Sequence, residues 1–333
     1  MIIIDKAILH ILDFNSGMTV YSDEELTIQD SIETFLMKHI EKSWGSQEAK
    51  PGTFYDDSSF QKMMGEYLAG DMSFVPFSQA VTHMLEDAFT HAEETASAVV
   101  IVAYVRIDDQ RQIAVFKSNS HIGYTHQVNQ TENGIKNEII NHYSIMPNLT
   151  QKMDEFAFIN TETKAISVNS KKYTIDGNSI YVFPEILLEC SLAPSPKEAI
   201  KNLSKTAAKV AEAYGQDKVS TEAAVKSYVA ENMQESNELD LVDAGKEIFR
   251  ENPAMQADFD NAIKDAGFTE PVKMDQEATI KKVCKHKLKT DTGIELTIPT
   301  DYFDNTEYVE FNNNDDGTLS ITLKHIANIV NRG

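Results

Sequence analysis

The chain of 333 residues is poor in cysteine and glycine, which already argues against several classes of protein. Its two cysteines, Cys190 and Cys284, lie far apart, so they form neither a disulfide framework nor a metal-spaced cluster. Reduced thiols of a cytoplasmic protein are expected instead. The 14 glycines are scattered, and the sequence has no phosphate-binding loop, dinucleotide-binding loop or nucleophile elbow. We therefore expect neither an enzyme built on glycine-rich loops nor a cofactor.

The sequence also lacks a long apolar run and a signal peptide. The longest apolar stretch, residues 96–105, is about half the length that a bilayer requires. Its β-branched residues are typical of a core strand. Residues 1–5 lack the basic region that opens a signal peptide. A cytoplasmic protein without a membrane partner is predicted.

Basic residues are scarce, because 30 lysines and arginines stand against 52 acidic residues, for a net charge of −22. Residues 1–100 carry −12, residues 101–200 carry −2, and residues 201–333 carry −8. Such a surface repels nucleic acid on average. Binding to DNA would therefore need a local basic patch, a metal ion or a partner protein.

The first 192 residues show the mixed periodicity of an α+β domain, with antiparallel strands and helices. β-branched runs predict strands at 7–14, 98–107, 112–116 and 156–168. Apolar residues at helical spacing predict helices at 27–44, 59–68 and 76–95, and a short one at 134–144. Pro194 and Pro196 then mark a domain boundary.

The second predicted domain, residues 197–333, has a helical section at 197–268 and a C-terminal β section at 278–333. Four helices are predicted in the helical section, at 197–214, 219–235, 240–250 and 254–266. Four β-like runs follow, at 278–289, 293–298, 306–312 and 317–323.

Two faint patterns suggest metal chemistry. Asp154, followed by Glu162 and Lys164, resembles the acid and acid-x-Lys of metal-dependent nucleases. A polar turn over 160–164 is the preferred interpretation of that segment. Three histidines could bind zinc, but their spacing fits no regular face, and hydrogen-bonded or surface histidines are preferred; they are His121, His126 and His142. We predict no metal site.

The basic signals are more informative. Four lysines recur every fourth residue on the predicted helix at 197–214, so they share one flank; they are Lys197, Lys201, Lys205 and Lys209. Residues 197–209 carry a net charge of +3. A solvated helix face and a ridge that contacts phosphates are both open interpretations.

A second cluster lies in the run 278–289, which holds no acid and carries a net charge of +5. An edge strand kept soluble by lysine and a nucleic-acid patch are both open here. If the run is a strand, four of its lysines share one face and Lys282 points the other way. The cluster consists of Lys281, Lys282, Lys285, Lys287 and Lys289.

Several segments together resemble a known family. Four segments, namely residues 6–13, the predicted helical run 77–89 that begins Phe-Ser, and the closing runs 293–299 and 316–324, are similar to the bacterial 37 kDa nucleoid-associated proteins of the YejK/NdpA type. The resemblance implies association with bacterial chromosomal DNA in the nucleoid. It implies no established catalytic centre and supplies no functional residue to carry over.

The expected function is therefore a nucleoid-associated protein that is not an enzyme. It would contact double-stranded DNA through the lysine patches, or reach DNA through a DNA-bound protein. The sequence leaves open whether the protein forms a homo-oligomer. Two alternatives stay open. One is an acidic regulator that binds a DNA-handling enzyme, and the other is a metal-dependent nuclease.

Overall fold

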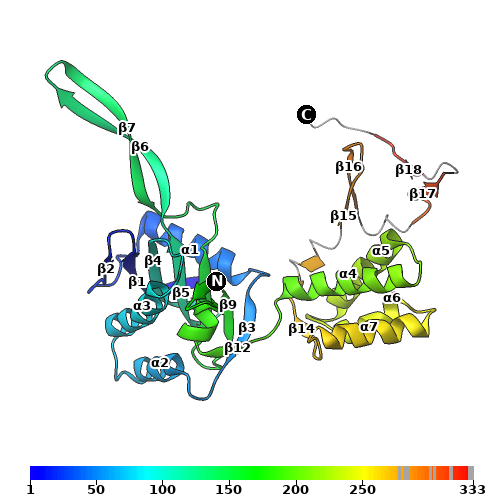
Figure 1. Cartoon of the computed structure of the whole chain (residues 1–333), viewed down its shortest axis with the longest axis horizontal. Coiled ribbons are helices and arrows are strands. Elements are labelled where there is room, and N and C mark those ends of the chain that lie inside the picture. Colours follow the sequence, from blue (N-terminus) through cyan, green and yellow to red (C-terminus); the bar gives the residue numbers. More distant parts are fainter. Residues whose placement is uncertain (277–278, 281–284, 300–301, 303–304, 315–317, 329–333) are drawn as a thin grey trace. The chain divides into compact units, whose positions relative to one another are not determined.

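The computed structural model describes residues 1–276, 279–280, 285–299, 302, 305–314 and 318–328. The chain forms two compact units, unit 1 at Met1–Ala193 and unit 2 at Pro194–Gly333. Figure 1 shows strands with helices in unit 1, and helices followed by small hairpins in unit 2. The predicted α+β class is confirmed. The predicted domain limits, 1–192 and 197–333, stay a prediction.

Unit 1 is built on an eight-stranded sheet in which every paired strand is antiparallel. The strand order is β12-β3-β9-β8-β5-β4-β1-β2. The strands are β1 (Ile2–Asp13), β2 (Met18–Val20), β3 (Lys50–Phe54), β4 (Ala98–Ile107), β5 (Gln110–Asn119), β8 (Glu155–Asn160), β9 (Ile166–Asn169) and β12 (Cys190–Leu192).

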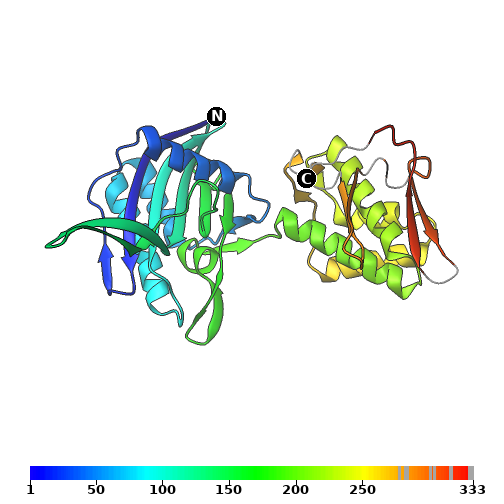
Figure 2. The same ribbon diagram turned by 90° about the horizontal axis from the view of Figure 1, so that it is seen from above.

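Helices cover both faces of this sheet (Figure 2). Val100 and Val102 of β4 face a core shared with α3, whereas Ile101 and Ala103 face a core shared with α1. Burial on both faces is why this strand is apolar throughout rather than at alternate positions. The helices are α1 (Asp30–Trp44), α2 (Ser59–Ala69), α3 (Phe74–Thr90) and the short π-helix η1 (Val182–Leu187).

A buried ion pair joins β5 to β8 inside the α3 face. Lys117 Nζ lies 3.4 Å from Glu155 Oε2, and the two side chains are 1% and 0% exposed. The ammonium group also lies 4.5 Å from the ring centre of Phe89 in α3. Tyr173 donates to the Glu155 carboxylate at 2.6 Å. Burial lowers the pKa of Lys117, and the adjacent Glu155 carboxylate opposes that change.

Two hairpins of unit 1 lie outside the large sheet. β10 (Lys172–Ile175) pairs with β11 (Asn178–Tyr181), and β6 (His121–Thr131) pairs with β7 (Gly134–Ile145) to form a long ribbon. The helix predicted at 134–144 is therefore wrong. Ile135 and Ile139 are four residues apart, which suits a helix, but both lie on one face of the strand because four is also an even number. Pairing with β6 decided between the two.

Unit 2 holds the four predicted helices, α4 (Pro196–Ala213), α5 (Lys218–Glu235), α6 (Leu241–Ile248) and α7 (Pro253–Asp265). Their buried faces form one apolar core. α6 and α7 approach closely at Gly245, where an added Cβ would lie 2.7 Å from a Phe259 ring carbon. A short hairpin of β13 (Glu238–Leu239) and β14 (Val272–Lys273) joins these helices.

The C-terminal β section forms two hairpins, β15 (Lys285–Lys289) with β16 (Glu295–Pro299), and β17 (Val309–Asn313) with β18 (Leu319–Leu323). The predicted strand start at 278 is wrong, because Thr279 and Ile280 are helical and the strand begins at Lys285. Side chains of both hairpins pack together with Ala223 of α5.

The buried ion pair yields a prediction about stability. Lys117→Met and Glu155→Gln should each cost about 3–5 kcal/mol, because each leaves the other group without its main partner in a dry site. The double variant should lose less than the two singles together. Urea unfolding followed by the fluorescence of Trp44, the single tryptophan and a residue of unit 1, measures this. The control is Lys172→Met, which removes an exposed lysine of unit 1 and should cost little. If the losses in free energy of the two single variants simply add in the double variant, Lys117 and Glu155 are not coupled.

A buried histidine predicts how stability depends on pH. Burial, followed by the nearby charge of His83, lowers the pKa of His10 to about 4. The unfolded chain, with a histidine pKa of about 6.5, binds more protons between these values. Stability from His10 is therefore present above about pH 6.5 and is lost as the pH falls towards about 4. In the variant His10→Gln, the free energy of unfolding, followed by Trp44 fluorescence, should fall less steeply than in the parent between about pH 6.5 and about pH 4. An equal pH dependence in the variant and the parent would contradict the role of His10.

Candidate nucleic-acid interface

The N-terminus of α4 is held by a capping box. Ser195 Oγ accepts a hydrogen bond from the Glu198 backbone N–H at 3.2 Å, and the Glu198 carboxylate accepts one from the Ser195 N–H at 3.0 Å. Pro196 at the first helical position suits this start. Glu198 is the only acid between 197 and 209, and its carboxylate is engaged at the cap. The cap therefore fixes the residue at which α4 starts, and with it the direction in which each later residue of the helix faces around the axis.

The four predicted lysines of α4 are all exposed and lie on one flank of the helix, here called the lysine ridge; they are Lys197, Lys201, Lys205 and Lys209. Each step of four residues rises about 6 Å and turns about 40° further round the axis. The ridge is thus about 18 Å long. Within the described residues, no carboxylate forms an ion pair with Lys201, Lys205 or Lys209.

The opposite face of α4 is apolar and fixes which flank points outward. Ala199, Leu203, Ala207, Val210 and Ala211 are buried against α5 and α7. Because these positions recur at three and four residues, the helix cannot rotate without exposing them. The core of unit 2 therefore holds the lysine ridge towards solvent.

The second predicted cluster is only partly within the described chain. Lys281 and Lys282 lie outside the described residues. Lys285, Lys287 and Lys289 occupy alternate register positions of β15. Leu288, in the same strand, packs in the small core of the two hairpins. Glu295 of β16 lies opposite Lys289 in the register.

The two units differ in charge. Residues 1–193 hold 13 basic and 27 acidic residues, a net charge of −14, whereas residues 194–333 hold 17 and 25, a net charge of −8. Both lysine clusters belong to unit 2, the less acidic one. The bases of unit 1 are largely engaged, as in the bidentate pairing of Arg106 with Asp5.

The structure separates the residues of the nuclease-like pattern. Asp154 precedes β8, whereas Glu162 and Lys164 follow it, so six strand residues and about 20 Å lie between them. The predicted polar turn over 160–164 is confirmed, because the Asn160 side chain accepts the backbone N–H groups of Glu162 and Thr163, each at 2.9 Å. Asp154 instead pairs with Lys171 at 2.6 Å. The three groups do not form one metal site.

The three histidines considered for zinc all lie on the ribbon of β6 and β7. His126 pairs with Ile139 in the register and His142 with Gly123, which places these two histidines on opposite faces. Among the described residues, no group of three or more His, Cys, Asp or Glu side chains is arranged to hold a metal ion. Cys190 is buried, which raises the pKa of its thiol to about 12.

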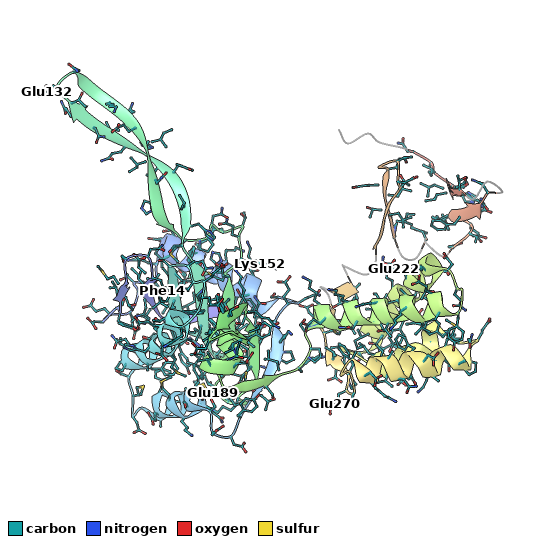
Figure 3. All side chains as sticks on the ribbon, viewed as in Figure 1. Phe14, Glu132, Lys152, Glu189, Glu222 and Glu270 are labelled. Carbon is teal, nitrogen blue, oxygen red and sulfur yellow. The ribbon has the colours of Figure 1, made fainter. Side chains whose placement is uncertain are left out.

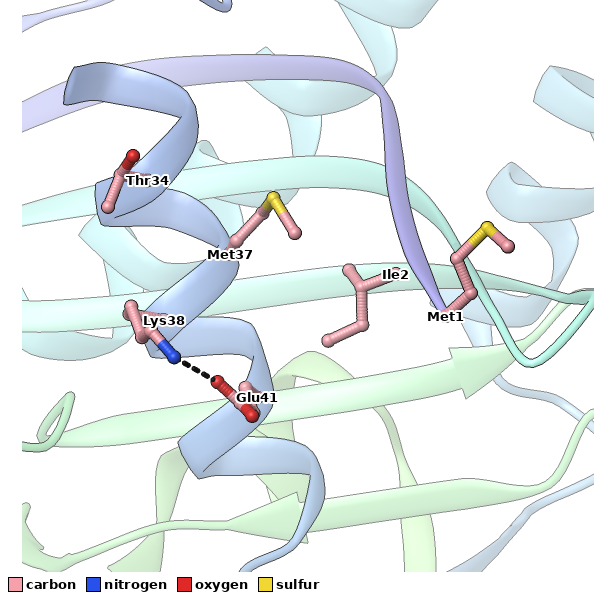
Figure 4. A pocket seen from close by; sticks show the side chains of 6 residues that line it. All are labelled: Met1, Ile2, Thr34, Met37, Lys38 and Glu41. Carbon is pink, nitrogen blue, oxygen red and sulfur yellow. Dashed lines mark hydrogen bonds and ion pairs between the residues drawn. The ribbon is translucent and has the colours of Figure 1, made fainter. Parts of the chain in front are cut away.

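Two surface pockets of unit 1 are possible binding sites. One lies beside α1 and is lined by Met1, Ile2, Thr34, Met37, Lys38 and Glu41, with Lys38 and Glu41 paired at 2.9 Å (Figure 4). The other is lined in part by Lys152, Asp154 and Lys171. In both, lining lysines pair with carboxylates, Lys152 with Glu48 at 3.8 Å among them. Neither pocket presents an unpaired catalytic group or a concentration of positive charge.

Sequence reasoning did not find the apolar side chains that the ribbon exposes. Tyr124, Ile135 and Ile139 are each at least 74% exposed. The signal was present as alternating apolar and polar residues in 122–128, but the helical spacing within 134–144 concealed the partner strand.

Comparison with known proteins assigns the chain to a protein family. The family described as nucleoid-associated protein YejK matches residues 8–330, which is nearly the whole sequence. The search of curated proteins gave no significant match. No helix in the described part of the chain is both long and apolar enough to cross a membrane. The chain therefore belongs to the YejK family of nucleoid-associated proteins.

Proposed function

We propose that this protein associates with chromosomal DNA in the nucleoid, and that unit 2 makes the contact through the lysine ridge of α4. The observation that carries the proposal is a row of four exposed lysines on a capped helix whose other face is buried. Membership of a nucleoid-associated family supports DNA as the partner. The lysines of residues 281–289 would extend the contact.

The dimensions of the ridge suit a phosphate backbone. Along one strand of B-form DNA the phosphates are about 3.4 Å apart in axial rise, so a ridge of about 18 Å spans about five of them. Contacts of this kind are insensitive to base sequence, because they read only the charge of the backbone. The expected binding is therefore non-specific and strongly dependent on salt.

The net charge of −22 opposes this binding at long range. At physiological ionic strength, however, charges farther apart than about 8 Å are largely screened. A ridge of exposed lysines then interacts mainly with the phosphates that it touches, and acidic groups farther than this from the DNA contribute little. Local attraction at the ridge is compatible with an acidic chain for this reason.

The first functional prediction concerns the ridge. Replacing Lys197, Lys201, Lys205 and Lys209 by Gln should weaken binding to all duplex sequences alike. The slope of log affinity against log salt should flatten by about 0.9 for each phosphate that the variant no longer neutralises. Fluorescence anisotropy with a labelled duplex, over a series of salt concentrations, measures both.

The matched control replaces four exposed lysines of unit 1, namely Lys38, Lys62, Lys152 and Lys172, by Gln. It changes the net charge by the same amount, so general repulsion from DNA increases equally in both variants. The control should keep the parental salt slope. Equal losses of affinity in the two variants would show that only net charge matters and would overturn the role of the ridge.

A second prediction concerns the cluster at residues 281–289. Changing Lys281, Lys282, Lys285 and Lys287 to Ala should flatten the salt slope further when it is combined with the ridge variant. If the ridge variant and the variant of residues 281–287 both bind DNA with the affinity and salt slope of the parent, the lysines serve solubility alone.

The alternative is indirect association, in which acidic unit 1 docks on a basic DNA-handling protein. The net charge of −14 on residues 1–193 favours it, since opposite charges speed encounter and make it salt-sensitive. Titration of bare duplex at low salt separates the two cases. Binding there supports direct contact, whereas no binding there, together with binding to a DNA-handling protein, supports the alternative. We propose no catalytic role.

A further inference from the structure

The ribbon of β6 and β7 extends from the end of β5 and pairs with no other strand of the described chain (Figure 1). Its side chains stand clear along its length, with Glu132 at the tip (Figure 3). An isolated two-stranded hairpin is marginally stable in water, because it has no second layer to bury its apolar side chains. The two strands of the ribbon, of 11 and 12 residues, expose apolar side chains, so we expect another surface to cover them.

The strand register sorts the side chains of the ribbon onto two unlike faces. The apolar face carries Tyr124, Val128, Ile135 and Ile139, which are 75%, 61%, 74% and 81% exposed. The remaining strand positions on this face between 124 and 141 hold no Asp, Glu, Lys or Arg; they are His126, Gln130, Asn137 and Asn141.

The other face, the polar face, holds the charged residues of the two strands. Lys136 forms an ion pair with Glu138, which also accepts a hydrogen bond from Asn129 at 2.6 Å. Thr125 and Gln127 lie on the same face, and Ile140, which is 37% exposed, lies opposite Thr125 in the register. The ribbon is therefore amphipathic, although both of its faces are open to solvent.

We propose that the apolar face of the ribbon is a self-association surface, on which two copies of this chain pack face to face around a two-fold axis. The proposal does not depend on DNA binding. Its chemistry is that of an interface core, with aliphatic and aromatic side chains flanked by amides that can both donate and accept hydrogen bonds.

Charge selects a second copy over a charged partner. DNA would require cations, but the ribbon has one lysine, already paired, and a net charge of −1 over residues 121–145. A strongly basic or acidic protein would find no counter-charge on the apolar face and would lose hydration there without compensation. An identical apolar face carries no charge that would lose its hydration. A two-fold axis brings such a face into contact, because it places the same surface of each copy opposite the other.

The area and the reach of the ribbon also fit. Four large exposed side chains on each of two ribbons, with the flanking amides, would bury on the order of 1,000 Å² in total, which is near the lower limit of specific interfaces. A strand of 11 residues spans about 35 Å, several times the Debye length. Contact through the ribbons can thus keep the acidic unit 1 of each copy beyond the range of strong repulsion.

The test compares two variants of the full chain that add the same two negative charges. Val128→Glu with Ile139→Glu places them on the apolar face, whereas Thr125→Glu with Gln127→Glu places them on the polar face of the same ribbon. Sedimentation equilibrium measures the association of the parent and both variants. Trp44 fluorescence checks that unit 1 stays folded, and Ile139→Asn serves as a milder apolar-face variant.

The parent should show twice the monomer mass of 37.3 kDa at micromolar concentration. The apolar-face variant should dissociate at least about 100-fold more readily, and the polar-face variant should behave as the parent. A parent that stays monomeric overturns the proposal. A dimer that persists in the apolar-face variant also overturns the proposal, and edge-to-edge pairing of strands would give that result. A dimer that both variants disrupt equally overturns it as well.

Discussion

A lysine and a glutamate with almost no exposed surface face each other near the middle of the large sheet, Lys117 on β5 and Glu155 on β8. Burying two charges is costly, and their mutual attraction offsets that cost only when the remaining donors and acceptors are satisfied. Here Asn119, Tyr173 and Ser170 complete the hydrogen bonding. The arrangement therefore requires β5, β8, α3 and β10 to be in place together, which couples the sheet to its helical cover.

The buried ion pair also fixes the position of the base of the ribbon. Asn119, which accepts from Lys117, is the last residue of β5, and its backbone N–H donates to Asp154 at 2.9 Å. β6 begins two residues later. The base of the ribbon is thus anchored beside the buried polar contacts of unit 1, while the rest of the ribbon is free of the sheet. A rigid base and an exposed apolar face are what a surface for another copy of the chain needs.

Charge is divided in a way that suits a protein of the nucleoid. The net negative charge is larger in unit 1, at −14 against −8 in unit 2, and many lysines and arginines of unit 1 pair within the unit. Unit 2 instead presents lysines on a helix whose residues 197–209 hold a single acid, Glu198. A chain that were basic throughout would bind any polyanion, including RNA and acidic membranes. A small ridge on an acidic chain instead confines attraction to the ridge, and two copies joined through their ribbons would present two ridges to one DNA molecule.

The sequence alone determined the α+β class, the four helices after Pro194 and the common flank of Lys197, Lys201, Lys205 and Lys209, because period and capping are local properties. It could not choose between helix and strand for residues 134–144, since apolar residues four apart suit both. Nor could it pair Lys117 with Glu155, or place Asp154 and Lys164 at opposite ends of β8. Those depend on contacts between residues distant in the chain, which only the tertiary structure decides.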